Sequence, residues 1–473
     1  MSKDEVTTGG GATTAGGGVT DQGPARATAA EAAVRAAAGA AALRRGLGTV
    51  RRHLPVGPVA RRRARTAARV AAWSGAGAVA ATSLAAAGMS GLAAFFVRRV
   101  VTPVHERPDD VRVLAVDADG TGPDGPVITV TADAQTRARG RYVLLLDGGR
   151  RSAQVGDVVR EEDGAVVRQL LSVPDGGIAP GPARWSGVVH VGDPTAALGL
   201  PHEDVLVPTP LGGLPAWFVP AQRARATGAE DGSATADDQP AGAEVWAVLV
   251  HGRGATREEC LRAVPLLHRL GLSCLVPAYR NDADAPVEAA SHYGLGDTEW
   301  LDVEAAVLHA LDHGAREVVL VGWSMGGAIV LQLATRSWTA DRVRALVLDS
   351  PVVDWRDVLE HAARQNRLPQ LALRLGIAML ARPEARALLG VSAPIDITRL
   401  DWVVRADELH LPALLLHAGE DDVVPIGPSR RLAAARPDLV VFRDFPGAQH
   451  TKEWNTDPDR WEREVARFLL EHL

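Results

Sequence analysis

The chain has 473 residues, of which 47% are hydrophobic, and a formal net charge of -6. This length suggests two or three folding units with enough apolar side chains for a large core. The acidic balance offers no basic face, so we exclude nucleic-acid binding. Two cysteines cannot make a disulfide framework, and HExxH and paired CxxC motifs are missing from the sequence. We therefore expect no bound metal and no other cofactor.

The first part of the chain predicts disorder followed by a membrane helix. Residues 1–67 are mainly Gly, Ala, Thr and Arg, which cannot bury enough apolar surface to fold. No charge then occurs from Val70 to Val97, a stretch long enough to cross a bilayer. We predict a single transmembrane helix within residues 68–100, with membrane association through residues 70–97. An Ala-rich soluble or surface helix is the alternative.

Arginines flank this stretch unevenly. Before it lie Arg51, Arg52, Arg61, Arg62, Arg63, Arg65 and Arg69, and after it lie Arg98, Arg99, Arg107 and Arg112. An excess of basic residues marks the cytoplasmic side, so the pattern favours a cytoplasmic N-terminus and an extracytoplasmic remainder. A cytoplasmic location of the whole chain is the alternative.

The next part reads as a small β-rich unit. Between residues 105 and 220, short apolar runs such as Tyr142–Leu146 alternate with Gly- and Pro-containing turns, a pattern typical of antiparallel strands. Residues 221–243 are rich in Ala, Gly and Asp and are expected to form a linker.

Residues 244–473 alternate buried-type strands with helical patterns. Strands that are apolar throughout, such as Val245–Val250 and Val318–Val321, predict an α/β fold with a mostly parallel sheet covered by helices on both faces. Residues 356–409 interrupt the alternation with helical segments. An insertion at this place in the strand order is expected to form a lid over a pocket.

Gly322-Trp323-Ser324-Met325-Gly326 stands between a predicted strand and a predicted helix. A serine on so sharp a turn needs residues without Cβ atoms two positions before and after it, and glycine occupies both. The pattern predicts that Ser324 is a nucleophile. The alternative is an ordinary glycine-rich turn.

A serine nucleophile needs a base and an acid. His450 follows the last predicted strand and precedes the terminal helix, the position of the base in this strand order. Asp421 and Asp422 follow the preceding strand, and the spacing to Pro425 favours Asp421 as the acid that orients the histidine. Asp349 could serve only in a less common arrangement. The loop His251-Gly252-Arg253-Gly254 and the residue after the nucleophile would supply the oxyanion hole, through the N–H groups of Arg253 and Met325.

Together these motifs resemble the α/β-hydrolase superfamily over residues 244–473. The segments at 251–259, 279–282 and 322–327 are similar to those of a largely uncharacterised actinobacterial group of serine esterase-, lipase- or peptidase-like proteins. The resemblance implies an N-terminal hydrophobic segment and a β-rich unit before the hydrolase. Tyr279-Arg280-Asn281-Asp282 departs from the superfamily, in which Tyr-Arg-Gly is common.

We expect a serine hydrolase that cleaves a carboxylic ester of a small-molecule acyl substrate through an acyl-enzyme on Ser324. A thioesterase, a peptidase and a non-catalytic binding or scaffold protein are the alternatives, because the fold alone does not define the substrate.

Overall fold

The computed structural model describes residues 58–104, 107–222, 244–286 and 292–473. The chain divides into two compact units, residues 1–83 and residues 84–473. Helix α2 (Pro58–Val101) contributes to both. The predicted disorder is wrong for residues 58–67, which form the first turns of this helix. Ala and Arg, which are frequent there, both favour helix. The rest of that region, and the predicted linker from residue 223 to 243, lie outside the described residues.

A small antiparallel barrel follows in the second unit, as the β-rich pattern predicted. Its strands close in the order β1-β2-β5-β4-β3-β6. They are β1 (Val111–Asp117), β2 (Val127–Thr131), β3 (Tyr142–Leu146), β4 (Arg151–Glu162), β5 (Ala165–Leu170) and β6 (Gly181–Ser186). The barrel encloses its own core of apolar side chains, in which Tyr142 stacks on Trp185.

The remaining strands form one eight-stranded sheet with the order β14-β13-β12-β11-β9-β10-β8-β7. The six strands from β9 onward are parallel, so the predicted fold class is confirmed. Their bounds are β9 (Val245–Val250), β10 (Ser273–Pro277), β11 (Glu317–Trp323), β12 (Val343–Asp349), β13 (Ala413–Ala418) and β14 (Val440–Phe445). Parallel strands buried on both faces explain the continuous apolar runs of the sequence.

The hairpin of β7 (Glu203–Thr209) and β8 (Gly212–Val219) belongs to this sheet, because β8 pairs with β10. The predicted boundary at residue 220 is therefore wrong, and the hydrolase sheet begins near residue 203. An antiparallel hairpin next to antiparallel barrel strands carries the same alternating pattern, so the pattern could not separate them.

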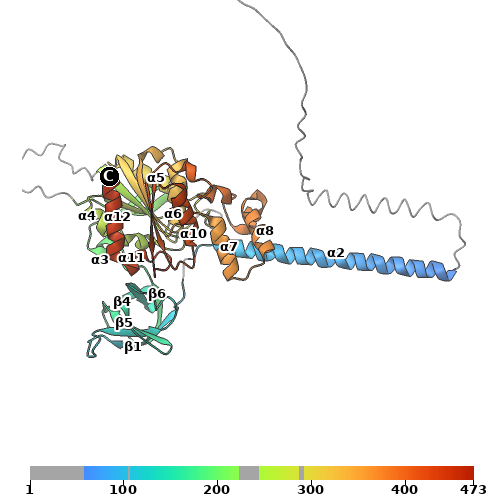
Figure 1. The fold of residues 1–473 in the computed structure, drawn as a ribbon, viewed down its shortest axis with the longest axis horizontal. Helices are drawn as coiled ribbons and strands as arrows, with labels where there is room; N and C mark the ends of the chain where they lie inside the picture. The colour runs from blue at the N-terminus through green and yellow to red at the C-terminus, as the bar shows by residue number, and fades with distance from the viewer. Residues whose placement is uncertain (1–57, 105–106, 223–243, 287–291) are drawn as a thin grey trace, which may run out of the picture. The chain divides into compact units, whose positions relative to one another are not determined.

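Helices cover both faces of the sheet (Figure 1). One face packs against α5 (Trp300–Asp312), α6 (Met325–Arg336) and α10 (Ile426–Ala435), and the other against α4 (Val264–Arg269), α11 (Glu453–Thr456) and α12 (Pro458–His472). Between β12 and β13, the predicted lid region contains α7 (Trp355–Gln365), α8 (Gln370–Leu380) and α9 (Arg386–Leu389). The short helix α3 (Pro194–Leu198) lies earlier in the chain, between β6 and β7.

The last turns of α2 pack against the lid. Ala94, Phe96, Val97 and Val101 are buried in the same core as Leu373 of α8 and Leu389 of α9. Within the described residues, Ser83–Val101 is the one helical stretch long and apolar enough to cross a membrane. Other parts of the protein cover 28% of this helical stretch.

Candidate active site

Ser324 lies at the turn between β11 and α6, with φ 52° and ψ -114°. This conformation is unusual for a residue with a Cβ and costs on the order of 1–3 kcal/mol. The flanking glycines explain why the turn can form. A Cβ at Gly322 would lie 2.6 Å from the Gly326 carbonyl oxygen, and a Cβ at Gly326 would lie 2.1 Å from the Val250 carbonyl oxygen.

Three loops at the carboxyl end of the sheet bring the predicted residues together. His450 Nε2 lies 2.9 Å from Ser324 Oγ, and His450 Nδ1 lies 2.7 Å from Asp421 Oδ2. The Asp421 carboxylate is buried, and its Oδ1 also accepts the backbone N–H groups of Val423 and Val424. Asp422 is exposed instead, and Asp349 contacts other groups. The geometry therefore matches the predicted choice of Asp421.

A second histidine, which the sequence reasoning missed, lies against the same carboxylate. His417 Nε2 is 3.5 Å from Asp421 Oδ2, and its Nδ1 is 2.9 Å from Ser429 Oγ. Burial works against ionisation of Asp421, but the fields of His450 and His417 and their hydrogen bonds outweigh it. They hold the pKa of Asp421 well below its usual range, so the carboxylate is charged at neutral pH.

The loop after β9 approaches Ser324 closely. A Cβ at Gly252 would lie 3.1 Å from Ser324 Cβ. The Gly252 N–H is already bound by Glu259 Oε2 at 2.8 Å, whereas the N–H groups of Arg253 and Met325 have no acceptor among the described residues. These two donors, which the sequence predicted, are thus the ones available to a substrate oxygen.

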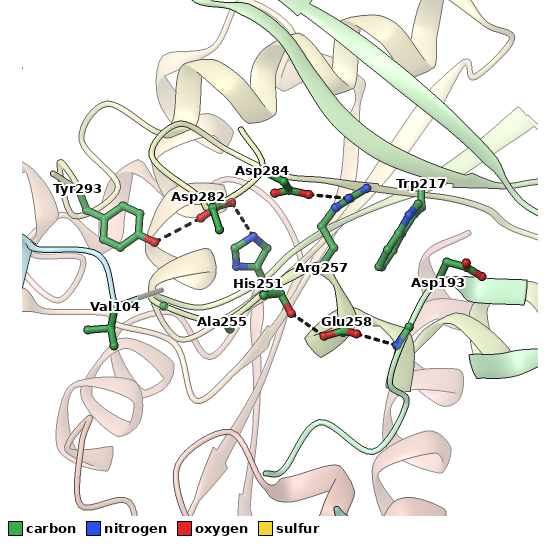
Figure 2. A pocket seen from close by; sticks show the side chains of 14 residues that line it. Val104, Asp193, Trp217, His251, Ala255, Arg257, Glu258, Asp282, Asp284 and Tyr293 are labelled. Atoms are coloured by element: carbon green, nitrogen blue, oxygen red, sulfur yellow. Dashed lines mark hydrogen bonds and ion pairs between the residues drawn. The ribbon is translucent and has the colours of Figure 1, made fainter. Parts of the chain in front are cut away.

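His251 and Asp282 stabilise the loop after β9 (Figure 2). His251 Nε2 lies 3.0 Å from Asp282 Oδ2, and its Nδ1 lies 3.0 Å from the Gly252 carbonyl. Burial works against a charge on His251, but the Asp282 carboxylate raises its pKa overall. Both ring nitrogens lie within hydrogen-bond distance of oxygen atoms, an arrangement that favours the protonated ring. The departure noted at residues 279–282 therefore supplies a carboxylate partner for His251.

A cavity of about 300 Å³ lies on the outer side of this loop. Figure 2 shows its lining, in which Arg257 lies over the Trp217 ring and pairs with Asp284. Ser324, Asp421 and His450 are not among its described lining residues.

A buried polar chain links the barrel to both catalytic loops. Arg262 pairs with Glu259 and donates to the carbonyl of Thr451, the neighbour of His450. It also contacts Asn455 Oδ1, and Asn455 Nδ2 donates to the carbonyls of Arg141 and Gly187 at the barrel. The barrel thus supports the oxyanion loop and the histidine loop through one set of hydrogen bonds.

Asp349 and Glu453 form a buried pair of carboxyl groups beneath the site. Asp349 Oδ2 accepts from Trp461 Nε1 at 2.7 Å, and Glu453 Oε1 accepts from Ser350 Oγ at 2.6 Å. Burial and the neighbouring Asp349 raise the pKa of Glu453 well above its usual value. Glu453 therefore keeps its proton to a higher pH than an ordinary glutamate does.

Metal-binding geometry does not occur in the described part of the chain, where no three His, Cys, Asp or Glu side chains are grouped to hold an ion. Cys260 and Cys274 are both free and buried.

Known proteins resemble both the sheet and the barrel. The family model described as "alpha/beta hydrolase fold" matches residues 247–376, and "Domain of unknown function (DUF8805)" matches residues 112–186. A pimeloyl-[acyl-carrier protein] methyl ester esterase of Chromobacterium violaceum is 27% identical over 181 residues, 33% of this chain and 69% of that protein. An uncharacterized protein of Mycobacterium tuberculosis is 29% identical over 230 residues, 48% of this chain and 70% of that protein.

Among solved structures, an esterase of Pyrococcus furiosus aligns with a TM-score of 0.44 and 16% identity over 60% of this chain and 97% of that chain. The parallel sheet, the serine turn after β11 and the histidine after the last strand define an α/β-hydrolase fold. These matches and the fold bear out the predicted resemblance to the α/β-hydrolase superfamily. The family description and the named relative support a hydrolase.

Glu453→Gln tests the protonated carboxyl. A raised pKa in the folded state means that the folded chain binds more protons than the unfolded chain, so this contribution to stability is full at low pH and is lost as pH rises. The wild-type free energy of unfolding should fall between pH 5 and pH 9 relative to that of Glu453→Gln, by about 1.4 kcal/mol for each unit of pKa difference traversed. Urea unfolding of both proteins across this range measures the difference in free energy of unfolding. If that free energy changed with pH in the same way in both proteins, the pKa of Glu453 would not be raised.

Proposed function

We propose that the chain is a serine hydrolase that cleaves a carboxylic ester through an acyl-enzyme on Ser324. The observation that carries this proposal is the unbroken hydrogen-bonded chain from Ser324 Oγ through His450 to Asp421. Serine alone is a weak nucleophile, and a base within hydrogen-bond reach activates it.

The reaction follows from the orientation of His450. Asp421 Oδ2 accepts a hydrogen bond from the Nδ1–H group of His450, which keeps that proton on Nδ1 and leaves the lone pair of Nε2 directed at Ser324. As Ser324 Oγ attacks the ester carbonyl carbon, Nε2 takes the hydroxyl proton and then gives it to the departing alcohol. Water, deprotonated by His450, attacks the acyl-enzyme, and the collapse of that intermediate returns the proton to Ser324 and releases the acid.

Charge develops on the carbonyl oxygen in each tetrahedral intermediate. We assign its stabilisation to the backbone N–H groups of Arg253 and Met325, which flank Ser324 on two sides. Donors fixed in place before the reaction lower the barrier because they need no reorganisation. The His251–Asp282 contact holds the loop that presents Arg253.

Esters rank first among acyl substrates because relatives of this chain are named methyl ester esterases. A peptidase activity and a non-catalytic scaffold role have no observation of their own that favours them.

Labelling with a fluorophosphonate probe tests the nucleophile. The wild-type chain should be labelled covalently and should hydrolyse p-nitrophenyl acetate, whereas Ser324→Ala and His450→Ala should lose both properties without unfolding, because these side chains act in chemistry on loops at the sheet edge. Circular dichroism is the control for folding. Labelling of folded Ser324→Ala at the wild-type rate would assign the nucleophile elsewhere, and an unlabelled, inactive wild-type chain would favour the scaffold role.

Asp421→Asn and Asp422→Asn form a matched pair that tests the acid. Asparagine at 421 lacks the carboxylate charge that holds Nδ1–H of His450 in place and stabilises the imidazolium, so kcat should fall by about 10⁴-fold. Asp422 is exposed and its replacement should leave kcat within about twofold. Steady-state kinetics on one ester compare the two, and the opposite ranking would move the acid by one residue.

We also propose that the chain is anchored in a membrane by α2, with the N-terminus in the cytoplasm and the hydrolase outside. The length and composition of Ser83–Val101 and the arginine asymmetry support this proposal.

Extraction experiments test the anchor. Full-length protein should remain with membranes in high salt and in carbonate, since the apolar helix is held by the hydrocarbon core and not by screened charges. A fragment beginning at Gly91 keeps the turns of α2 that pack on the lid and should be soluble. Release of the full chain by salt alone would indicate peripheral binding, and protection of the hydrolase from protease added to spheroplasts would reverse the orientation.

A further inference from the structure

The final turns of α2 are fixed against the lid helices. A Cβ at Gly376 of α8 would lie 2.6 Å from Val97 Cγ2, so the two helices touch at a glycine. Arg98 Nη1 donates to the Leu388 carbonyl of α9 at 2.8 Å. Any membrane segment in α2 therefore continues directly into the lid.

The residues that follow these turns contact the oxyanion loop and its neighbourhood. The Val101 carbonyl accepts the Tyr293 N–H at 2.8 Å. The Thr102 carbonyl lies 3.4 Å from Arg253 Nη1, and Arg107 Nη2 donates to the Gly254 carbonyl at 3.1 Å. The end of α2 and the site of oxyanion binding are thus joined by direct hydrogen bonds.

The docked turns define how much of α2 remains for lipid. Ala93, Val97 and Val101 are fully buried by protein, so the part of the uncharged stretch that precedes these docked turns runs from residue 70 to residue 92. At 1.5 Å per residue this part is about 34 Å long, enough to cross a hydrocarbon core of about 30 Å. The membrane surface would then lie where α2 meets the lid.

The outer surface of the lid has the composition of a membrane-contacting surface. On α8, exposed Leu371 and Arg374 share the face opposite buried Leu373 and Gly376. Leu388 on α9 is also exposed, by 55%. Five arginines and one acidic residue occur from residue 362 to 390, although the whole chain has a net charge of -6: Arg364, Arg367, Arg374, Arg382, Arg386 and Glu384.

Four of these arginines, Arg367, Arg374, Arg382 and Arg386, are exposed and have no acidic partner within the described ranges, whereas Arg364 pairs with Glu360. Ion pairs within the protein therefore do not account for the presence of these arginines on the lid. Exposed leucines next to unpaired arginines suit the boundary between acyl chains and anionic headgroups, where each basic residue adds to the attraction.

We propose that the lid rests on an anionic membrane surface and that the substrate is an amphiphile resident in that membrane, whose acyl ester passes from the leaflet to Ser324. This inference rests on the proposed serine hydrolase activity. The short path from α2 to the oxyanion loop places the reacting bond near the headgroup level, where the ester of such an amphiphile lies.

The test uses the full chain in vesicles of phosphatidylcholine with or without phosphatidylglycerol. Two esters are compared: water-soluble p-nitrophenyl acetate, and 4-methylumbelliferyl oleate dissolved in the bilayer. The variant combines Arg374→Glu, Arg382→Glu and Arg386→Glu. A control with the same change of charge combines Arg139→Glu, Arg150→Glu and Arg463→Glu, at exposed positions on the barrel and α12.

In anionic vesicles the lid variant should hydrolyse the oleate ester at least about tenfold more slowly than the control. Each reversed arginine removes an attraction that strengthens binding of the lid to the anionic surface about fivefold. Both should hydrolyse p-nitrophenyl acetate at the wild-type rate. The difference should shrink without phosphatidylglycerol and in high salt, because these charges are screened.

Equal rates of oleate hydrolysis by the lid variant and the control would overturn the inference while leaving the hydrolase assignment intact. Failure of the wild-type chain to hydrolyse either ester would contradict the proposed function itself. If the charge-reversed lid misfolds by circular dichroism, Leu371→Gln with Leu388→Gln serves as the second variant. It should also slow the oleate ester selectively, and a wild-type rate from it would overturn the proposal.

Discussion

The site depends on the close approach of two backbones. The Val250 carbonyl at the end of β9 lies where a Cβ at position 326 would be, and the Gly326 carbonyl lies where a Cβ at position 322 would be. Only glycine at both positions allows α6 to begin directly beneath Ser324, and Ser324 itself accepts a positive φ as a result. The same backbone contact places the loop after β9 next to Ser324. The proposed nucleophile and the proposed oxyanion donors are therefore positioned together by this one contact.

The other two members of the proposed triad come to this turn along parallel strands. Asp421 follows β13 and His450 follows β14, and all parallel strands present their carboxyl ends at one edge of the sheet. Arg262 and Asn455 then tie the histidine loop to the oxyanion loop and to the barrel. The barrel therefore acts on the hydrolase as a support for its loops, a physical role for a domain whose family has no assigned function.

Sequence alone predicted the parts that local pattern determines. The apolar runs predicted the parallel strands, and the glycine spacing with the strand order predicted the three side chains that the structure brings into one hydrogen-bonded chain, Ser324, Asp421 and His450. It missed the partners that distant loops contribute, such as Glu259, Asp282 and His417, because a buried carboxylate or histidine has no periodic signal. It also assigned β7 and β8 to the barrel, since pairing partners are not encoded in the alternation of one strand.

The central claim is that hydrolysis passes through an ester of Ser324, and rapid mixing of the enzyme with p-nitrophenyl acetate tests it most directly. The account predicts a burst of about one nitrophenolate per protein molecule if deacylation is the slower step, and acid quenching should leave an acetyl group on the peptide that contains Ser324. Turnover with no acetylated peptide at any quench time, or with the acetyl group on a different residue, would contradict it.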